Sequence, residues 1–502
     1  MRVLLHCDGG PGVGVGHTVR SLALAEEALS RGHEVTIAGW VGGDFLEGLV
    51  AEREQTGLVR HPLEAGAGAA ELAGLVDELA PHVVHLDSYR TPDVAGTLVE
   101  RHPGVLVSNA QDGGYGRRHA DVVIDSTLGA EEMADVPGTV RWRLLGASCA
   151  PLRHEVLRHR HRPGHTPGDA LEVLVVMGGT DATGAAPYAL DVLGRCGVAA
   201  RVTVIATAPL ADEVASVARQ HPQLSVEVVG PVRDLPALMA RQDLVLSASG
   251  TSTWELCAMA VPMGLICVVD NQLAGYRRLV DRGAAVGLGG PDLSGPQRDL
   301  AVDALAPALL DAGLRASLAR TAATVVDGHG AWRLVRTWEV ASGSRPRRAA
   351  PALTASRAVM EDARTLWRWR NDPETRSRSR SQKPVAWDDH VRWLTGSLDR
   401  ADRLLLVVSD EAGQVGTVRW DLEGDGEWEV SITVAPERRG AGLAVPMLEA
   451  AQSALLDTHG VRRFRAAIHI DNTASRRLFV TAGYVPHQPP DEAGFETYVL
   501  LP

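Results

Sequence analysis

The stretch Gly12-Val-Gly-Val-Gly16-His17-Thr-Val-Arg20 follows the first apolar run of the chain and precedes a helix-like segment that reaches about Ser30. A strand, a turn of small residues and a helix start leave backbone N–H groups pointing outward, which makes a site for phosphate-like anions. A histidine in such a turn can reach the bound group. Glycine turns also close ordinary βα units, and His17 fits a solvated helix-start residue as well, so the pattern alone favours the ordinary turn.

Further apolar runs alternate with helical stretches, which predicts βα units and parallel sheets. The strands expected in the first series are 3–5, 35–38, 83–86, 105–107, 122–124 and 144–145. A second series is expected at 174–177, 202–205, 226–229, 244–248 and 265–268. Two doubly wound halves, each opening on a glycine turn, predict a ligand cleft between them.

Breaks in the pattern give the expected domain boundaries. We expect a Rossmann-like half at 1–155, a second at 165–341, a linker at 342–351 and a separate domain at 352–502. The linker is rich in proline, arginine and small residues, as exposed tethers are. The helical stretch 332–340 is expected to pack back across the first half.

Composition excludes several function classes. The net charge of -12 argues against nucleic-acid or acidic-membrane partners, although a local basic pocket for an anionic metabolite is compatible with it. No apolar segment is long enough to span a bilayer, and the first residues lack the features of a signal peptide. The five cysteines form no Cys-x-x-Cys pair, which argues against disulfides and a zinc site. We therefore expect a reduced, cytoplasmic protein without a metal.

A second glycine turn, Ser249-Gly250-Thr251-Ser252, also lies between an expected strand and an expected helix. Its backbone N–H groups and hydroxyls suit a pyrophosphate. Glu255 is placed to accept both hydroxyls of a ribose, or to close a capping box that begins at Ser252; these two interpretations are even. The amides of Asn271 and Gln272 either bind a sugar or turn a loop.

Four motifs occur in a fixed order along roughly residues 1–340. They are Gly14-x-Gly16-His17-x-x-Arg20, Asp87-Ser88-Tyr89, Gly178-Gly179-Thr180-Asp181, and Ser249-Gly250-Thr251 continuing to Trp254-Glu255, Pro262 and Gln272. Together they resemble the UDP-sugar hydrolase of pseudaminic acid biosynthesis (UDP-2,4-diacetamido-2,4,6-trideoxy-β-L-altropyranose hydrolase). That family is similar to the MurG-type glycosyltransferases, so the resemblance implies a GT-B fold of two Rossmann-type domains. The motifs are more specific for this superfamily than for the hydrolase.

The resemblance implies that the second half binds UDP, with residues 249–252 at the phosphates and Glu255 at the ribose. His17 would face the anomeric carbon and take a proton from the attacking water. The leaving diphosphate, held by N–H groups, then needs little acid assistance. Free sugar and UDP would be the products.

Other motif positions are expected to support the substrate. Asp8 is a candidate to orient His17 or a sugar amide, although a strand-end aspartate is more often a turn cap. Tyr89 either reaches the cleft or fills a loop. Gly179 and Asp181 either face the cleft or make an ordinary turn. His6-Cys7 stands where the hydrolases usually have an arginine before this aspartate, which bears on the identity of the sugar.

The last part of the chain carries a third glycine turn. The alternating strand 428–434, which ends at Val434, precedes Arg439-Gly440-Ala-Gly442-Leu-Ala444 and a helix to about Asp457. This turn resembles the pyrophosphate loop of GNAT acetyltransferases, where backbone N–H groups hold coenzyme A. The segment from Asn472 and Ser475 to Tyr484 resembles the same family, which implies acetyl-CoA as cofactor. Trp369-Arg-Asn-Asp-Pro373 and His390-x-x-Trp393 resemble the aminosugar N-acetyltransferases.

The residues that would act as acid and base in that acetyl transfer fit the family pattern less well than the coenzyme loop does. Phe479 stands where many GNAT members have a tyrosine that protonates the coenzyme thiolate, and phenylalanine cannot donate a proton. The domain would then use another proton donor or water, or its acetyltransferase activity would be weak or absent. Glu429 is the candidate base for the attacking amine; an exposed strand carboxylate without a role is about as compatible.

These expectations combine into one leading hypothesis. We expect a bifunctional enzyme that N-acetylates a UDP-aminosugar and hydrolyses a UDP-diacetamido-trideoxyhexose. The first alternative is a GT-B glycosyltransferase that moves the sugar to an acceptor other than water, fused to an N-acetyltransferase. The second is a sensor or scaffold that binds its ligands without turnover.

Overall fold

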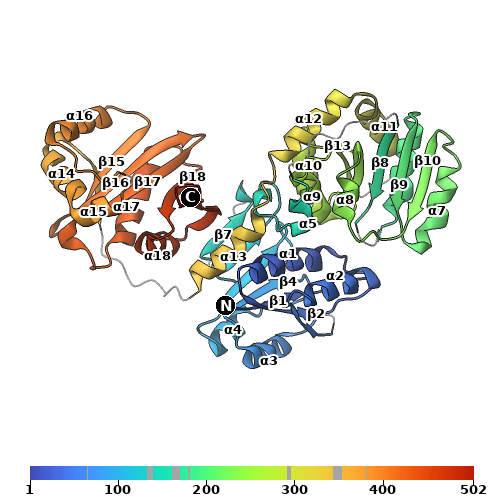
Figure 1. Cartoon of the computed structure of the whole chain (residues 1–502), viewed down its shortest axis with the longest axis horizontal. Helices are drawn as coiled ribbons and strands as arrows, with labels where there is room; N and C mark the ends of the chain where they lie inside the picture. Colours follow the sequence, from blue (N-terminus) through green and yellow to red (C-terminus); the bar gives the residue numbers. More distant parts are fainter. Residues whose placement is uncertain are drawn as a thin grey trace. The chain divides into compact units, whose positions relative to one another are not determined.

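The computed structural model describes residues 1–64, 66–132, 140–160, 170–178, 181, 183–290, 295–342, 353–379 and 381–502. These form two compact units, Met1–Trp338 and Glu339–Pro502 (Figure 1). The predicted linker falls almost entirely outside the described residues.

The first unit begins with a seven-stranded parallel sheet, which we call the sheet of the first lobe. Its strands, in spatial order, are β3 (Val59–Pro62), β2 (Glu34–Gly39), β1 (Arg2–Cys7), β4 (Val83–Asp87), β5 (Leu106–Gln111), β6 (Val122–Asp125) and β7 (Trp142–Leu145). The connecting helices are α1 (Gly16–Ser30), α2 (Asp44–Glu54), α3 (Ala69–Leu79) and α4 (Ala95–Arg101). β4 to β6 are buried along their whole length, as strands covered on both faces must be.

The second lobe has a six-stranded parallel sheet. Its order is β10 (Leu224–Val229), β9 (Ala200–Ile205), β8 (Leu171–Val176), β11 (Leu244–Ala248), β12 (Met263–Ile266) and β13 (Val286–Gly287). Its helices are α5 (His154–Leu157), α6 (Ala185–Arg195), α7 (Ala208–Ala218), α8 (Leu235–Met239), α9 (Thr251–Ala258), α10 (Leu273–Asp281), α11 (Gly295–Leu310) and α12 (Ala312–Ala323). α5 packs against α8 and α9 of this lobe.

The last helix of this unit, α13 (Gly330–Ala341), returns to the first lobe, as the sequence predicts. Trp338 is fully buried, with its ring centroid 5.4 Å from that of His85 on β4. Arg333 is also buried and donates to the Ser148 carbonyl. The first lobe is therefore completed by a helix that lies almost two hundred residues further along the chain.

The second unit is an α/β domain with a seven-stranded sheet. Its strands, in spatial order, are β14 (Thr354–Arg357), β15 (Arg403–Asp410), β16 (Gly413–Gly424), β17 (Glu427–Val434), β18 (Arg463–His469), β20 (Phe495–Leu500) and β19 (Val485–Gln488). Its helices are α14 (Ala363–Asn371), α15 (Pro373–Ser377), α16 (Trp387–Leu398), α17 (Ala444–Leu456) and α18 (Thr473–Thr481). β17 and β18 pair in parallel over Glu427 to Glu429, although β17 continues to Val434, so the two strands diverge.

The predicted fold class is confirmed: two Rossmann-type sheets precede a separate α/β domain. Each predicted strand overlaps an observed one, and β12 lies two residues before its predicted position. In the first unit, β3 and β13 were not predicted. β3 is partly exposed along its length and β13 has two residues, so neither produces a clear apolar run.

Candidate active sites

A cavity of about 430 Å³ lies between the glycine turns of the two lobes. A Cβ atom at Gly16 would lie 2.7 Å from Thr251 Oγ1, which shows how closely the turns approach each other. Most of the predicted substrate residues line this cavity: Gly14, Gly16, His17, Arg20, Tyr89, Ser249, Gly250, Thr251, Ser252, Glu255, Asn271 and Gln272. The structure thus brings the histidine and the second glycine turn into one site.

His17 is held by a carboxylate at the end of β4. Its Nδ1 donates to Asp87 Oδ1 over 2.7 Å, and the histidine is 7% exposed. Among the hydrogen bonds between described residues, none uses His17 Nε2. This nitrogen is therefore the one that can meet a substrate, and the Asp87 bond fixes the tautomer that leaves it unprotonated.

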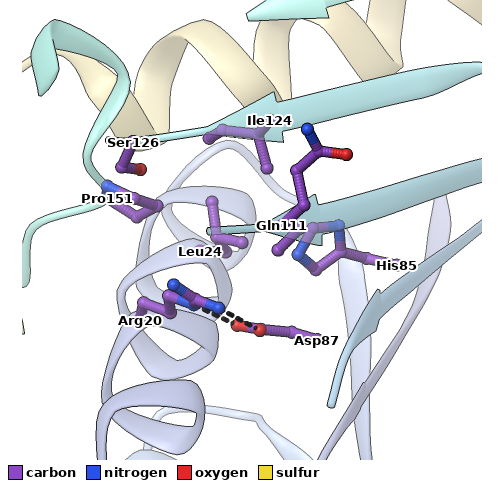
Figure 2. Close-up of a pocket in the computed structure, with 9 residues that line it drawn as sticks. Arg20, Leu24, His85, Asp87, Gln111, Ile124, Ser126 and Pro151 are labelled. Atoms are coloured by element: carbon purple, nitrogen blue, oxygen red, sulfur yellow. Dashed lines mark hydrogen bonds and ion pairs between the residues drawn. The ribbon is translucent and has the colours of Figure 1, made fainter. Parts of the chain in front are cut away.

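Arg20 joins Asp87 to a second carboxylate. Its Nε donates to Asp87 Oδ2 over 2.6 Å and its Nη1 to Asp112 Oδ1 over 2.8 Å, and Figure 2 shows the Arg20–Asp87 pair with His85 nearby. Burial disfavours the charged form of Asp87, but Arg20 and His17 outweigh it and hold the pKa of this carboxyl far below its usual range. The negative charge beside His17 is thus present at neutral pH and stabilises an imidazolium.

Tyr89 covers His17 and links the two lobes. The rings meet edge to face at 4.4 Å between centroids. The Tyr89 hydroxyl donates to Asp112 and accepts from Asn271 Nδ2 over 3.1 Å. Tyr89 is therefore part of the cavity wall rather than loop filler.

The second glycine turn opens α9 with Gly250 as N-cap and no side-chain cap. The backbone N–H groups of the first turn of α9 face a cavity with no acidic residue in that turn, which suits an anion. The capping box considered for Ser252 is not formed, because the N-cap is Gly250, two residues earlier, and Glu255 lies beyond the first turn of the helix. Glu255 Oε1 instead accepts from Arg153 Nη2 over 2.9 Å, in a pair that is buried on both sides.

Three first-unit predictions need correction or fall outside the structure. Asp8 accepts from the Trp40 N–H and the Ser88 hydroxyl, so Asp87 and not Asp8 orients His17. Asp181 accepts from the N–H groups of Ala185 and Ala186 at the start of α6 and does not line the cavity, so it makes the ordinary turn. Gly179 lies outside the described residues.

His6, the departure from the hydrolase pattern, is buried away from the cavity. Its Nδ1 donates to the Ala38 carbonyl over 3.0 Å, and its Nε2 accepts from Thr91 Oγ1 over 2.7 Å. His6 therefore does not act on the sugar through a direct contact.

The third glycine turn has the backbone expected of an anion loop. Gly440 and Gly442 have φ angles of +76° and +73°, which favour glycine, and α17 then starts at Ala444 without a side-chain cap. Val434 ends β17 on the diverging side of the sheet. This part of the domain therefore offers unpaired N–H groups at a helix start.

Several predicted cofactor residues also have structural partners. Arg439 forms ion pairs with Asp372 and Glu374, at 2.6 and 2.9 Å. Asn472 Oδ1 caps α18 by accepting from the Ser475 N–H over 3.1 Å. Glu429, the candidate base, lies 3.5 Å from Arg465 Nε. Glu429 is therefore a partly exposed strand carboxylate beside a cation.

Phe479 is buried and packs edge to face on Tyr484, with 5.0 Å between ring centroids. The Tyr484 hydroxyl is fully buried and accepts from Gln452 Nε2 over 3.1 Å. Burial raises the pKa of Tyr484, so this hydroxyl does not replace the missing acid.

Two searches of the described residues were negative. No group of three His, Cys, Asp or Glu side chains there is placed to hold a metal ion. None of the helices in the described ranges is both long and apolar enough to cross a membrane.

Comparisons with known proteins agree with this division. Residues 353–485 match the family model described as an Acetyltransferase (GNAT) domain. The chain is 29% identical over 315 residues to the UDP-N-acetylglucosamine--N-acetylmuramyl-(pentapeptide) pyrophosphoryl-undecaprenol N-acetylglucosamine transferase of Rhodospirillum centenum, covering 57% of this chain and 81% of the relative. The enzyme of that name from Sulfurimonas denitrificans is 41% identical over 63 residues, 12% of this chain and 18% of the relative.

The fold of the first unit also has a solved counterpart. The crystal structure of MurG from Acinetobacter baumannii matches with a TM-score of 0.50 and 15% identity, over 67% of this chain and 99% of that one. The N-terminal region therefore has a MurG-like GT-B fold, and the C-terminal region matches the model of the GNAT acetyltransferase domain. These findings fit the glycosyltransferase alternative better than the hydrolase.

Proposed function

We propose that the N-terminal unit transfers a sugar from a UDP-sugar to an acceptor, and that the C-terminal domain N-acetylates an aminosugar with acetyl-CoA. One observation carries the first half of the proposal: His17 and the Ser249–Ser252 turn line the same cavity. This chemistry needs a base and a diphosphate site in one space, and the shared cavity supports that assignment.

The residues of the cavity suit the individual steps. The N–H groups at the start of α9 would hold the diphosphate, and Glu255, fixed by Arg153 through Oε1, would offer Oε2 to the ribose. His17 Nε2 would take the proton of the acceptor hydroxyl as its oxygen bonds to the anomeric carbon. The bond from that carbon to the diphosphate breaks and UDP leaves, while Asp87 stabilises the imidazolium.

Hydrolysis is a second candidate that one observation favours. Tyr89 packs over His17, which is only 7% exposed. A narrow approach to the imidazole would favour water over a bulky acceptor, and the resemblance to the UDP-diacetamido-sugar hydrolases points the same way. Because the comparisons favour glycosyl transfer, that function is the main proposal.

An assay without an acceptor separates the two candidates. The full chain is incubated with UDP-N-acetylglucosamine and UDP-diacetamido-sugars, and UDP release is followed with and without aminosugar or lipid-linked acceptors. Release that requires an acceptor supports transfer, and rapid release without one supports hydrolysis. His17→Gln is expected to abolish either activity, while His61→Gln, on the edge strand β3 and away from the cavity, is the matched control. Full activity of His17→Gln would refute the proposed base.

The C-terminal half of the proposal rests on the GNAT match and on the loop at Gly440 and Gly442. Backbone N–H groups there would hold the pyrophosphate of acetyl-CoA, and Glu429 would accept the proton of the attacking amine. Thiol release from acetyl-CoA with a panel of UDP-aminosugars tests this. Binding of acetyl-CoA without thiol release would instead support a domain that binds its ligand without turnover.

A further inference from the structure

Tyr89 lies over His17 without being buried itself. It is 40% exposed, although its ring packs edge to face on the imidazole. Behind the ring lies Gly116, where a Cβ atom would be 3.2 Å from Tyr89 Cδ1. The position of the ring over His17 therefore depends on the backbone that carries Tyr89 and on the backbone behind it.

A buried arginine, Arg118, holds the backbone on both sides of Tyr89. Its Nε and Nη2 donate to the Thr91 carbonyl over 2.9 and 2.6 Å, and its Nη2 also donates to the Ser88 carbonyl. Ser88 and Thr91 are the two ends of the segment 88–91, which we call the Tyr89 loop. One guanidinium thus holds both ends of this loop.

The same guanidinium reaches the backbone behind the ring. Arg118 Nη1 donates to the Gly116 carbonyl over 3.3 Å and to Asn109 Oδ1 over 2.9 Å. Asn109 Nδ2 donates in turn to the Gly116 carbonyl over 2.9 Å. Arg118 therefore joins the Tyr89 loop to the glycine against which the ring lies.

The Tyr89 loop is also held at the end of β1. Thr91 Oγ1 donates to His6 Nε2 over 2.7 Å, and Ser88 Oγ donates to Asp8 Oδ2 over 2.9 Å. His6 and Asp8, which precede the first glycine turn in the sequence, therefore support the Tyr89 loop from its other side.

The hydrogen-bond acceptors of Arg118 are unusual for a buried cation. Among the described residues they are carbonyl and amide oxygens and include no carboxylate. Burial lowers the pKa of Arg118, although the charges of Asp87 and Asp93 oppose this effect. A guanidinium offers five N–H donors in a planar fork, and an ammonium offers three. Because a buried cation without an ion pair costs stability, the position that Arg118 imposes on the backbone explains it better than added stability does.

We propose that Arg118 is a positioning residue for the reaction at His17, and that it acts by fixing the Tyr89 ring against the imidazole. This inference rests on the proposed role of His17 as the base. Asp87 holds His17 at Nδ1, and the Tyr89 ring limits the tilt of the imidazole plane. The two contacts together keep Nε2 in one direction within the cavity.

Fluorine NMR of the full chain tests the position of the ring without any substrate. The chain has six tyrosines, so labelling with 3-fluorotyrosine gives a small set of signals, and Tyr89→Phe identifies the one from Tyr89. In Arg118→Met this signal is expected to move towards that of free 3-fluorotyrosine. Arg118→Lys, with three donors in place of five, is expected to lie between Arg118→Met and the wild type. Arg117→Met is the matched control, because Arg117 is exposed and its Nε donates to the Gly113 carbonyl.

Kinetics tests whether Arg118 acts through Tyr89. In Arg118→Met, kcat for UDP release is expected to fall about 10- to 100-fold while UDP affinity stays within about threefold, because the diphosphate site is on the other lobe. The double variant Tyr89→Ala with Arg118→Met is expected to have the kcat of Tyr89→Ala alone, since no ring is left to position. Thermal unfolding shows which variants are folded at the assay temperature. Arg118→Lys carries both tests if Arg118→Met is unfolded.

Two results would overturn the proposal. An unmoved Tyr89 signal in the folded Arg118 variants would show that the ring keeps its place without the guanidinium. Additive losses of kcat in the double variant would show that Arg118 acts on the reaction by a route other than Tyr89. A wild-type chain that releases no UDP from any UDP-sugar would refute the proposed base and the kinetic part of this inference. The fluorine signal would then decide by itself whether Arg118 holds the ring.

Discussion

At the scale of single residues, the cavity depends on one buried carboxylate that serves two cations. One oxygen of Asp87 accepts a hydrogen bond from His17 Nδ1, and both of its oxygens accept hydrogen bonds from Arg20. Removing its charge while keeping its shape would change the tautomer of His17 without emptying the space. The role of the pair can therefore be separated from its packing.

Asp87→Asn is expected to lower kcat for UDP release by about 10²- to 10⁴-fold, because the amide cannot stabilise the imidazolium. UDP affinity is expected to stay near wild type, since the diphosphate site is on the other lobe. Steady-state kinetics and UDP titration measure the two quantities. Asp93→Asn, in the exposed Asp93–His119 pair, is the control. Unchanged kcat in Asp87→Asn would exclude the proposed orientation of His17.

His85, buried under Trp338, makes a separate prediction about pH. Burial lowers the pKa of His85 to about 4, below the value of about 6.5 in an unfolded chain. Between these pH values the unfolded chain binds the extra proton, so the first unit loses up to about 3 kcal/mol of stability as the pH falls from about 6.5 to about 4. Denaturant unfolding at several pH values measures the slope. His85→Leu is expected to flatten it, and an unchanged slope would contradict the assignment.

Sequence reasoning found the residues that stand in local motifs and missed those that reach them from afar. His17 and Ser249 were predicted because a glycine turn surrounds each one. Asp112 and Arg153 were not, because Arg20 and Asp112 are 92 residues apart and Arg153 and Glu255 are 102 apart. No local pattern records such contacts.

At the scale of secondary-structure elements, the starts of α1 and α9 are built to face each other closely. Gly16→Ala would place its Cβ 2.7 Å from Thr251 Oγ1, so the hydroxyl must turn away or the two turns must separate. We expect UDP affinity to fall about tenfold, a cost of about 1.4 kcal/mol. Titration with UDP measures this change.

Two further variants show whether the effect comes from this contact. Thr251→Ala in the Gly16→Ala background removes the Oγ1 atom and is expected to recover part of the affinity, relative to Thr251→Ala alone. Gly48→Ala, inside α2 with nothing near its Cβ position, is the control and is expected to stabilise the unit by about 0.5–1 kcal/mol. Equal UDP affinity in Gly16→Ala and Gly48→Ala would show that UDP binding does not depend on the close approach of the two turns.

The central strands were predictable because continuous apolar runs mark strands that are buried on both faces. The divergence of β17 and β18 was not, because it depends on the pairing register and on no feature of either strand alone. Glu255 shows the same limit: the capping-box spacing from Ser252 was present, but the helix began two residues earlier than that box requires, and the Glu255 carboxylate pairs with Arg153.

At the scale of the whole molecule, the unit boundary at Trp338 and Glu339 runs through α13. A chain that ends at residue 342 keeps this helix, and a chain that ends at residue 329 lacks it. We expect the longer truncation product to fold and bind UDP. The shorter one is expected to be destabilised by at least the roughly 3–5 kcal/mol of a deleted buried tryptophan.

Thermal unfolding and UDP titration of both truncation products measure the difference. Because both products lack the GNAT domain, the longer one is the control for the loss of that domain. A shorter product as stable as the longer one would show that α13 is dispensable for the first lobe.

The return of α13 also determines when the first lobe is complete during synthesis. The ribosome must make the whole second lobe, from about residue 154 to residue 341, before Trp338 emerges. At about 5–20 residues per second this takes roughly 10–40 s. Throughout that interval Trp338 does not cover His85 and the residues around it on the nascent first lobe. Chaperones bind exposed surfaces of this kind.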